Sequence, residues 1–163
     1  MKSLTLSAVA ASLVLAGFAG GAQAQQAPQA KLFFEGDIVR HALADQAGPF
    51  CVLTNQFTRK EAVAWRIRVL LPNGEVADDK VLKGVVVELG NGIKLPAGYK
   101  PHGVPPTDHF WSLFWTIPGD FPTGSLGYKV IATMKDGSEV VWQPFTRPPT
   151  QLMVVAGDPV IKK

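Results

Sequence analysis

Residues 111–145, which read WSLFWTIPGDFPTGSLGYKVIATMKDGSEVVWQPF, contain the clearest strand and turn signals of the sequence. The first residues alternate so that one face of a strand carries bulky apolar side chains, namely Trp111, Leu113, Trp115 and Ile117. Phe110 and Phe114 fall on the opposite face. We therefore predict a strand that is apolar on both sides.

A corner and a hairpin follow this strand. Residues 118–124 (PGDFPTG) contain two prolines that fix φ and remove backbone donors, so neither a helix nor a strand continues through them. A half-buried strand is predicted next, with Tyr128, Val130, Ala132 and Met134 on one face. Asp136-Gly137 is a strong hairpin signal, and the return strand is predicted over residues 139–142.

The rest of the chain offers further strands. Residues 62–70 place Val63, Trp65, Ile67 and Val69 on one face, and Arg66 and Arg68 on the other. We predict other strands at 31–39 with a bend at Gly36-Asp37, and at 49–53, 84–89, 93–95 and 151–156. Asn91-Gly92 is a second hairpin signal. Residues 41–48 are expected to form a loop or one helical turn.

Residues 96–108 (PAGYKPHGVPPTD) are predicted to form a loop, because they contain four prolines and two glycines. With seven to nine short strands and turn signals between them, residues 31–156 are expected to form one all-β domain, an antiparallel β-sandwich. Residues 157–163 are expected to be a flexible tail.

The N-terminal residues resemble an export signal. Residues 1–24 combine Lys2, an apolar run over 4–18 and the cleavage pattern Ala22-Gln23-Ala24. The run is short and rich in alanine and glycine, so it does not predict a transmembrane helix. We expect cleavage near Ala24, a disordered leader at residues 25–30, and a mature protein that is periplasmic, in a Gram-negative bacterium, or secreted.

Charge and cysteine content narrow the choice of partners. The formal net charge is +3 and no run of Lys or Arg exceeds two residues, which argues against a nucleic-acid partner. Cys51 is the only cysteine, so an internal disulfide is excluded. The simplest interpretation of Cys51 is a small buried apolar side chain.

Three segments together resemble bacterial extracytoplasmic immunoglobulin-like modules. They are FTRKE at residues 57–61, the strand WRIRV at 65–69, and the corner and strand WTIPGDFPTGSLGYKV at 115–130. The resemblance implies an immunoglobulin-like sandwich with a binding or accessory role and supplies no catalytic residue set. The chain departs from antibody domains because it lacks their paired cysteines, so Trp65 is expected to pack on aliphatic side chains.

The function we predict is that of an exported, non-enzymatic module that binds a protein partner in the periplasm. The candidate surface is the loop at 96–108 with neighbouring side chains of strand residues, namely His102, His109, Phe110, Phe114, Arg66 and Arg68. Exposed aromatic rings and arginines are common in protein interfaces. The alternative for these aromatics is a place in the core, and for the arginines a solvated face paired with carboxylates.

A metal-handling or redox protein is the alternative function. Cys51, His41 and His109 are candidate ligands, and copper, with Met134 and Met153 as further soft ligands, is the candidate cofactor. No local metal motif supports this choice; otherwise no cofactor is predicted. Enzyme classes lack support, because the chain has no G-x-S-x-G elbow and no carboxylate pair beyond the adjacent Asp78-Asp79.

Overall fold

The computed structural model describes residues 31–48, 50–145 and 151–161, and contains ten strands and no helix in that part of the chain. The strands are β1 Phe33–His41, β2 Gln56–Thr58, β3 Ala62–Leu70, β4 Leu82–Leu89, β5 Lys94–His102, β6 Asp108–Thr116, β7 Gly124–Leu126, β8 Tyr128–Met134, β9 Glu139–Trp142 and β10 Leu152–Val155. The prediction of an all-β protein is confirmed.

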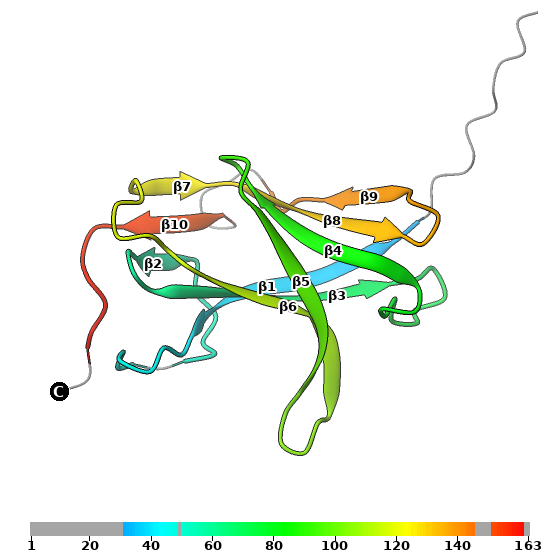
Figure 1. Ribbon diagram of the computed structural model, residues 1–163, viewed down its shortest axis with the longest axis horizontal. Coiled ribbons are helices and arrows are strands. Elements are labelled where there is room, and N and C mark those ends of the chain that lie inside the picture. The colour runs from blue at the N-terminus through cyan, green and yellow to red at the C-terminus, as the bar shows by residue number, and fades with distance from the viewer. Residues whose placement is uncertain (1–30, 49, 146–150, 162–163) are drawn as a thin grey trace, which may run out of the picture.

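Seven of these strands form one antiparallel sheet in the order β1-β3-β6-β5-β4-β8-β9. The sheet curls, so β1 and β3 come to lie across from β8 and β9 (Figure 1). Two ring contacts span the resulting interior. Trp65 of β3 meets Tyr128 of β8 edge-on with centroids 5.9 Å apart, and Phe34 of β1 stacks on Trp142 of β9 at 6.1 Å. A single curled sheet therefore supplies both layers around the core.

A second, small sheet covers one end of the curled sheet. Its order is β2-β10-β7, with β10 parallel to β2 and antiparallel to β7. Phe57, Leu152 and Val154 are buried and join the same core as the large sheet. The C-terminal strand β10 thus pairs with β2, which precedes β3, and with β7, which precedes β8.

The core follows the predicted alternation of side chains. The inward residues of β3 are all at most 2% exposed: Val63, Trp65, Ile67 and Val69. Trp111 and Ile117 are buried as well, and the Trp111 indole N–H donates to the carbonyl of Ala77 at 2.9 Å. Both predicted hairpins form, and Gly92 (φ 89°) and Gly137 (φ 88°) occupy the left-handed positions that their turns require.

The prediction of a loop over residues 96–108 is mostly wrong. β5 continues to His102 despite Pro96 and Pro101, and only residues 103–107 form a turn. The physical reason lies in the pairing, because β5 pairs with β4 over residues 94–97 and then with β6 over 98–102. Each half has one hydrogen-bonded neighbour, so a proline is tolerated where its nitrogen faces the unpaired side.

Two other expectations also need correction. Cys51 is exposed, with a left-handed φ of 57°, and not a buried apolar side chain. The strand expected at 49–53 reduces to a single bridge between Leu53 and Val39, and Val52 and Leu53 are exposed. Gly36 does not bend the first strand, since β1 pairs with β3 without interruption from Phe33 to His41.

The predicted signal peptide at 1–24 and the leader at 25–30 lie outside the described residues. No helix in the described part of the chain has the length and apolar character needed to span a bilayer. Residues after β10 contact the body of the domain. The Ala47 N–H donates a hydrogen bond to the Val160 carbonyl at 2.7 Å, and Gln46 forms an isolated antiparallel β-bridge with Ile161.

Candidate interaction surface

Five of the six predicted surface residues lie on the outer face of the strands β1, β3, β6 and β5. The strand register determines which side chains share this face. Between β1 and β3, Asp37 is opposite Arg66 and Glu35 is opposite Arg68. Arg66 is opposite Ser112 of β6, and Phe110 of β6 is opposite Lys100 of β5. Phe114 and His41 extend the same face at the other end of the strands. We call these residues the outer face; its predicted members are Arg66, Arg68, Phe110, Phe114 and His102.

Carboxylates hold the two arginines of the outer face in place. Arg66 donates two parallel hydrogen bonds to Asp37, at 2.7 and 2.6 Å, and this pairing raises the pKa of the guanidinium. Arg68 donates to Asp108 at 2.7 Å and lies 3.4 Å from Glu35. The pKa of Asp108 is lowered by the hydrogen bond from the His109 backbone and by Arg68. Both arginines are thus paired with carboxylates of neighbouring strands, as one of their two interpretations expected.

The two phenylalanines of the outer face are each stacked against a histidine. His102 lies parallel to Phe110 with centroids 3.7 Å apart, and His41 lies parallel to Phe114 at 4.5 Å. Phe110 is half-buried, whereas Phe114 is 59% exposed. The ring pairs therefore form two stacked polar and aromatic units on one sheet face, and the alternative of a core position for Phe114 is wrong.

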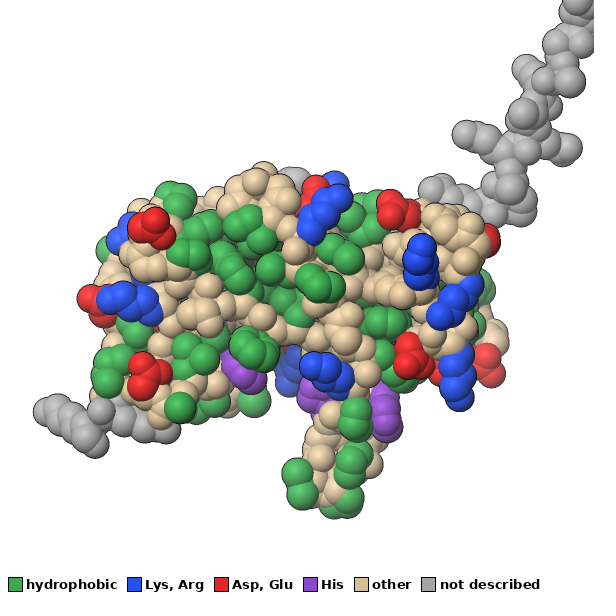
Figure 2. All heavy atoms as spheres, in the orientation of Figure 1, with side chains coloured by type: hydrophobic (Ala, Val, Ile, Leu, Met, Phe, Trp, Pro, Cys, Tyr) green, Lys and Arg blue, Asp and Glu red, His purple; other side chains and the backbone are tan. Residues whose placement is uncertain are grey.

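The hairpin of β5 and β6 projects from the body of the protein beside the outer face (Figure 1). Its turn, residues 103–107, presents Val104 fully exposed, followed by exposed Pro105 and Pro106. Figure 2 shows histidine side chains around the base of this hairpin and apolar side chains at its tip. A recess of about 270 Å³ lies on the outer face and is lined by Asp37, Arg66, Arg68 and Phe110 among others.

His109 is the predicted surface residue that does not share the outer face. It follows Asp108 on β6, so its side chain points to the other side of the hairpin, toward Tyr99 (centroids 5.9 Å). Tyr99 also contacts the buried Trp111. His109 thus continues the inner face of the sheet beyond the core and stays exposed there.

The structure does not bring the two candidate histidine ligands, His41 and His109, together. His41 is opposite Ala62, which is opposite Thr116, seven positions along β6 from His109. At about 3.3 Å per strand residue, the two histidines are separated by roughly 23 Å along the strand direction. Bonds from histidine to a metal are only about 2 Å long. Among residues 31–48, 50–145 and 151–161, no three His, Cys, Asp or Glu side chains are grouped to hold an ion.

A second region, which the sequence analysis missed, lies between the two end strands of the curled sheet. A cavity of about 570 Å³ opens there, lined by residues of β1, by the segment 53–55 and by residues 142–145. Trp142 and Tyr128 line it, and both looked like ordinary core residues in the sequence. Alternation alone cannot show which inward residues lie at an open seam, because that depends on where the sheet ends.

Comparisons with known proteins found no match to this chain among family models, curated proteins or solved structures.

Proposed function

We propose that this protein is an exported, non-enzymatic binding module that docks a protein partner on the outer face and on the projecting β5–β6 hairpin. The observation that carries the proposal is the exposed Phe114 beside side chains whose orientations are already fixed by pairing. A surface with few free rotamers loses little entropy when a partner binds. The immunoglobulin-like character of the fold belongs to the same proposal and is supported by the antiparallel strands around Trp65.

The state of the carboxylates supports binding over catalysis. Asp37 and Asp108 accept hydrogen bonds from arginines, and the pKa of Asp108 is held below its ordinary value. Asp108 therefore remains ionised at neutral pH and serves as an acceptor, whereas a general acid needs a raised pKa. The outer face is therefore suited to present a fixed pattern of charge and aromatic rings.

The projecting hairpin supports the same proposal in a different way. Val104 is fully exposed at the tip, and the tip is joined to the body by two strands whose base carries the His102–Phe110 stack. An apolar tip on a rigid arm is suited to insert into a pocket of a partner, where its buried area favours association.

Photo-crosslinking in the cells that naturally produce the protein tests the proposal. A photoreactive residue is placed at position 104, at 114, and, as a control, at the exposed Lys83 of β4, a strand separated from β6 by β5. We expect one and the same protein adduct from positions 104 and 114 and none from position 83. Equal adducts from all three positions, or none from positions 104 and 114, would contradict the proposal.

A further inference from the structure

The curled sheet stays open along one seam. Its end strands are β1 and β9, which are not hydrogen-bonded to one another. The Phe34–Trp142 stack bridges the seam. Beyond Ile38 the free edge of β1 is used locally, because Thr54 donates to the Ile38 carbonyl at 3.4 Å and Arg40 donates to the Val52 carbonyl at 3.2 Å. The 570 Å³ cavity fills the seam between these two contacts, and we call it the seam cavity.

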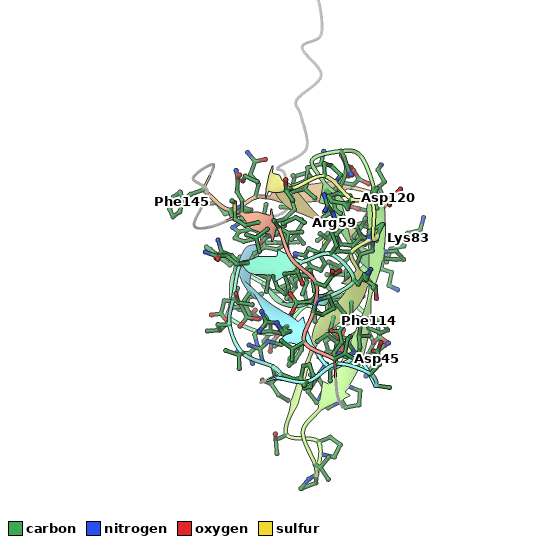
Figure 3. The ribbon with its side chains drawn as sticks, turned by 90° about the vertical axis from the view of Figure 1, so that its left-hand side faces the viewer. Asp45, Arg59, Lys83, Phe114, Asp120 and Phe145 are labelled. Atoms are coloured by element: carbon green, nitrogen blue, oxygen red, sulfur yellow. The ribbon has the colours of Figure 1, made fainter. Side chains whose placement is uncertain are left out.

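Apolar and aromatic side chains form most of the wall of the seam cavity. They come from both sides of the seam: Ile38 from β1, Leu53 from the segment after Cys51, and Trp142, Pro144 and Phe145 from the end of β9. Leu53 is 65% and Phe145 80% exposed, so a molecule in the cavity removes apolar area of both from water. In Figure 3, Phe145 extends from the body on the side away from Phe114.

The polar groups of the seam cavity carry no uncompensated charge. Both oxygens of Asp37 accept hydrogen bonds from Arg66, so the carboxylate is already neutralised by its partner. Burial, with a further contribution from the charge of Asp37, raises the pKa of the Tyr128 phenol to about 12. Tyr128 therefore keeps its proton at neutral pH, and its hydroxyl can donate to a ligand.

A smaller cavity adjoins the first. It holds about 370 Å³ and shares Tyr128, Gln143 and Pro144 with the seam cavity. Its charged residues, Glu88 and Lys129, form an ion pair at 3.0 Å and are also compensated. The polar side of the combined space is thus next to Tyr128 and Gln143, and the apolar side is next to Leu53 and Phe145.

We propose that the seam cavity binds an uncharged small molecule with a flat apolar or aromatic body and a hydrogen-bond acceptor. The body lies against Trp142, Leu53 and Phe145, and the acceptor receives the Tyr128 hydroxyl hydrogen. A volume of a few hundred Å³ with apolar walls and few polar groups is the usual form of a small-molecule site. This site shares Asp37 with the edge of the outer face, but it does not depend on the protein-binding proposal.

Two fluorescent probes test both parts of the proposal. Nile red is uncharged and aromatic and carries a carbonyl acceptor, whereas diphenylhexatriene is an uncharged aromatic hydrocarbon without any acceptor. We expect saturable one-to-one binding of both probes to the full chain. Leu53→Ser and Phe145→Ala remove wall contacts at exposed positions, where little folding stability depends on them, and should weaken both probes by about tenfold or more.

Tyr128→Phe separates the hydrogen bond from the wall. It should weaken Nile red by about five- to tenfold and leave diphenylhexatriene within about twofold. Phe114→Ala is the matched control for Phe145→Ala and should alter neither probe. Unsaturable binding, or equal losses in Phe114→Ala and Phe145→Ala, would refute the site, and equal losses of both probes in Tyr128→Phe would refute the acceptor. None of these readouts depends on the protein partner, so the two proposals fail separately.

Discussion

The outer face and the seam cavity each carry an exposed phenylalanine, yet the two surroundings differ. Phe114 is stacked on His41 on the face that also carries the ion pairs of Arg66 and Arg68, whereas Phe145 lies beside Trp142 and Leu53 at the mouth of a cavity. On the outer face the neighbours are charged and held by one another. At the seam they are mostly apolar, and the charges present are neutralised.

Exposure alone therefore does not define what an aromatic ring on the surface does. A ring among fixed charges suits a wet contact with a protein, where polar groups of the partner complete the pattern. A ring at the mouth of an apolar cavity suits a ligand that fits inside it.

The largest effect is expected from the buried side of β3. Trp65 is 1% exposed, so Trp65→Ala should lower the free energy of unfolding by about 3–5 kcal/mol, because it leaves a large cavity. Phe114→Ala, which removes a ring of the outer face, should cost less than about 1 kcal/mol. Guanidinium denaturation of both variants measures the contrast. Similar losses would mean that Phe114 is part of the stability core and not a free contact ring.

The next effect concerns Tyr128 at high pH. Its pKa rises from 10.0 to about 12 on folding, which corresponds to about 2–3 kcal/mol at about 1.4 kcal/mol per pKa unit. Because the folded state holds the proton more tightly, this stability is fully present below pH 10 and is lost as the pH rises through 12. Denaturation at rising pH should show this loss in the wild type and much less of it in Tyr128→Phe.

Titration of the Tyr128 phenol can be followed directly in a Tyr99→Phe variant. Tyr128 and Tyr99 are the chain's two tyrosines, so this variant leaves Tyr128 as the source of tyrosinate absorbance. The pKa of Tyr99 is also raised, mainly by burial and then by Asp78, but its hydroxyl lines neither the seam cavity nor its neighbour. Tyrosinate absorbance of Tyr99→Phe should titrate with one midpoint near 12. A midpoint near 10 would show that water reaches the Tyr128 phenol freely.

Much of the fold could be predicted from local pattern. Alternation gave the inward face of β3, and Asp136-Gly137 and Asn91-Gly92 gave two hairpins, because these signals lie within a few residues. The path of β5 could not be predicted, since Pro96 and Pro101 are tolerated only through a change of pairing partner. Such a change is a property of the whole sheet.

The candidate site was predictable to a similar extent. Strand alternation places Arg66 with Arg68 and Phe110 with Phe114, and register then brings both pairs onto one face. The same alternation puts His109 on the other side, which the sequence analysis overlooked when it grouped residues by proximity in the chain. No pattern in the sequence indicates the seam cavity. Residues 36–38 and residues 142–145 come close to one another only when the sheet curls.

A smaller effect is expected from the ion pair of the outer face. Asp37 and Arg66 are paired through two hydrogen bonds, but about a third of each side chain remains exposed, so water screens the attraction. A double-mutant cycle with Asp37→Ala and Arg66→Ala should give a coupling of about 1 kcal/mol in the free energy of unfolding. Lys60 and Asp158, a mostly exposed pair at 3.1 Å, form the control cycle and should couple by less than about 0.5 kcal/mol. Equal couplings would show that the two-point contact does not order Arg66.

The smallest effect is expected from the ring pair at the base of the hairpin. His102 and Phe110 are stacked at 3.7 Å across neighbouring strands, yet both stay partly exposed. A cycle with His102→Ala and Phe110→Ala should therefore show a coupling of only about 0.5 kcal/mol, at the lower end for aromatic pairs. The same variants should have a larger effect on the crosslinking yield at position 104, because they remove the support of the hairpin. A large coupling with an unchanged yield would assign the stack to folding and leave the outer face without its rigid arm.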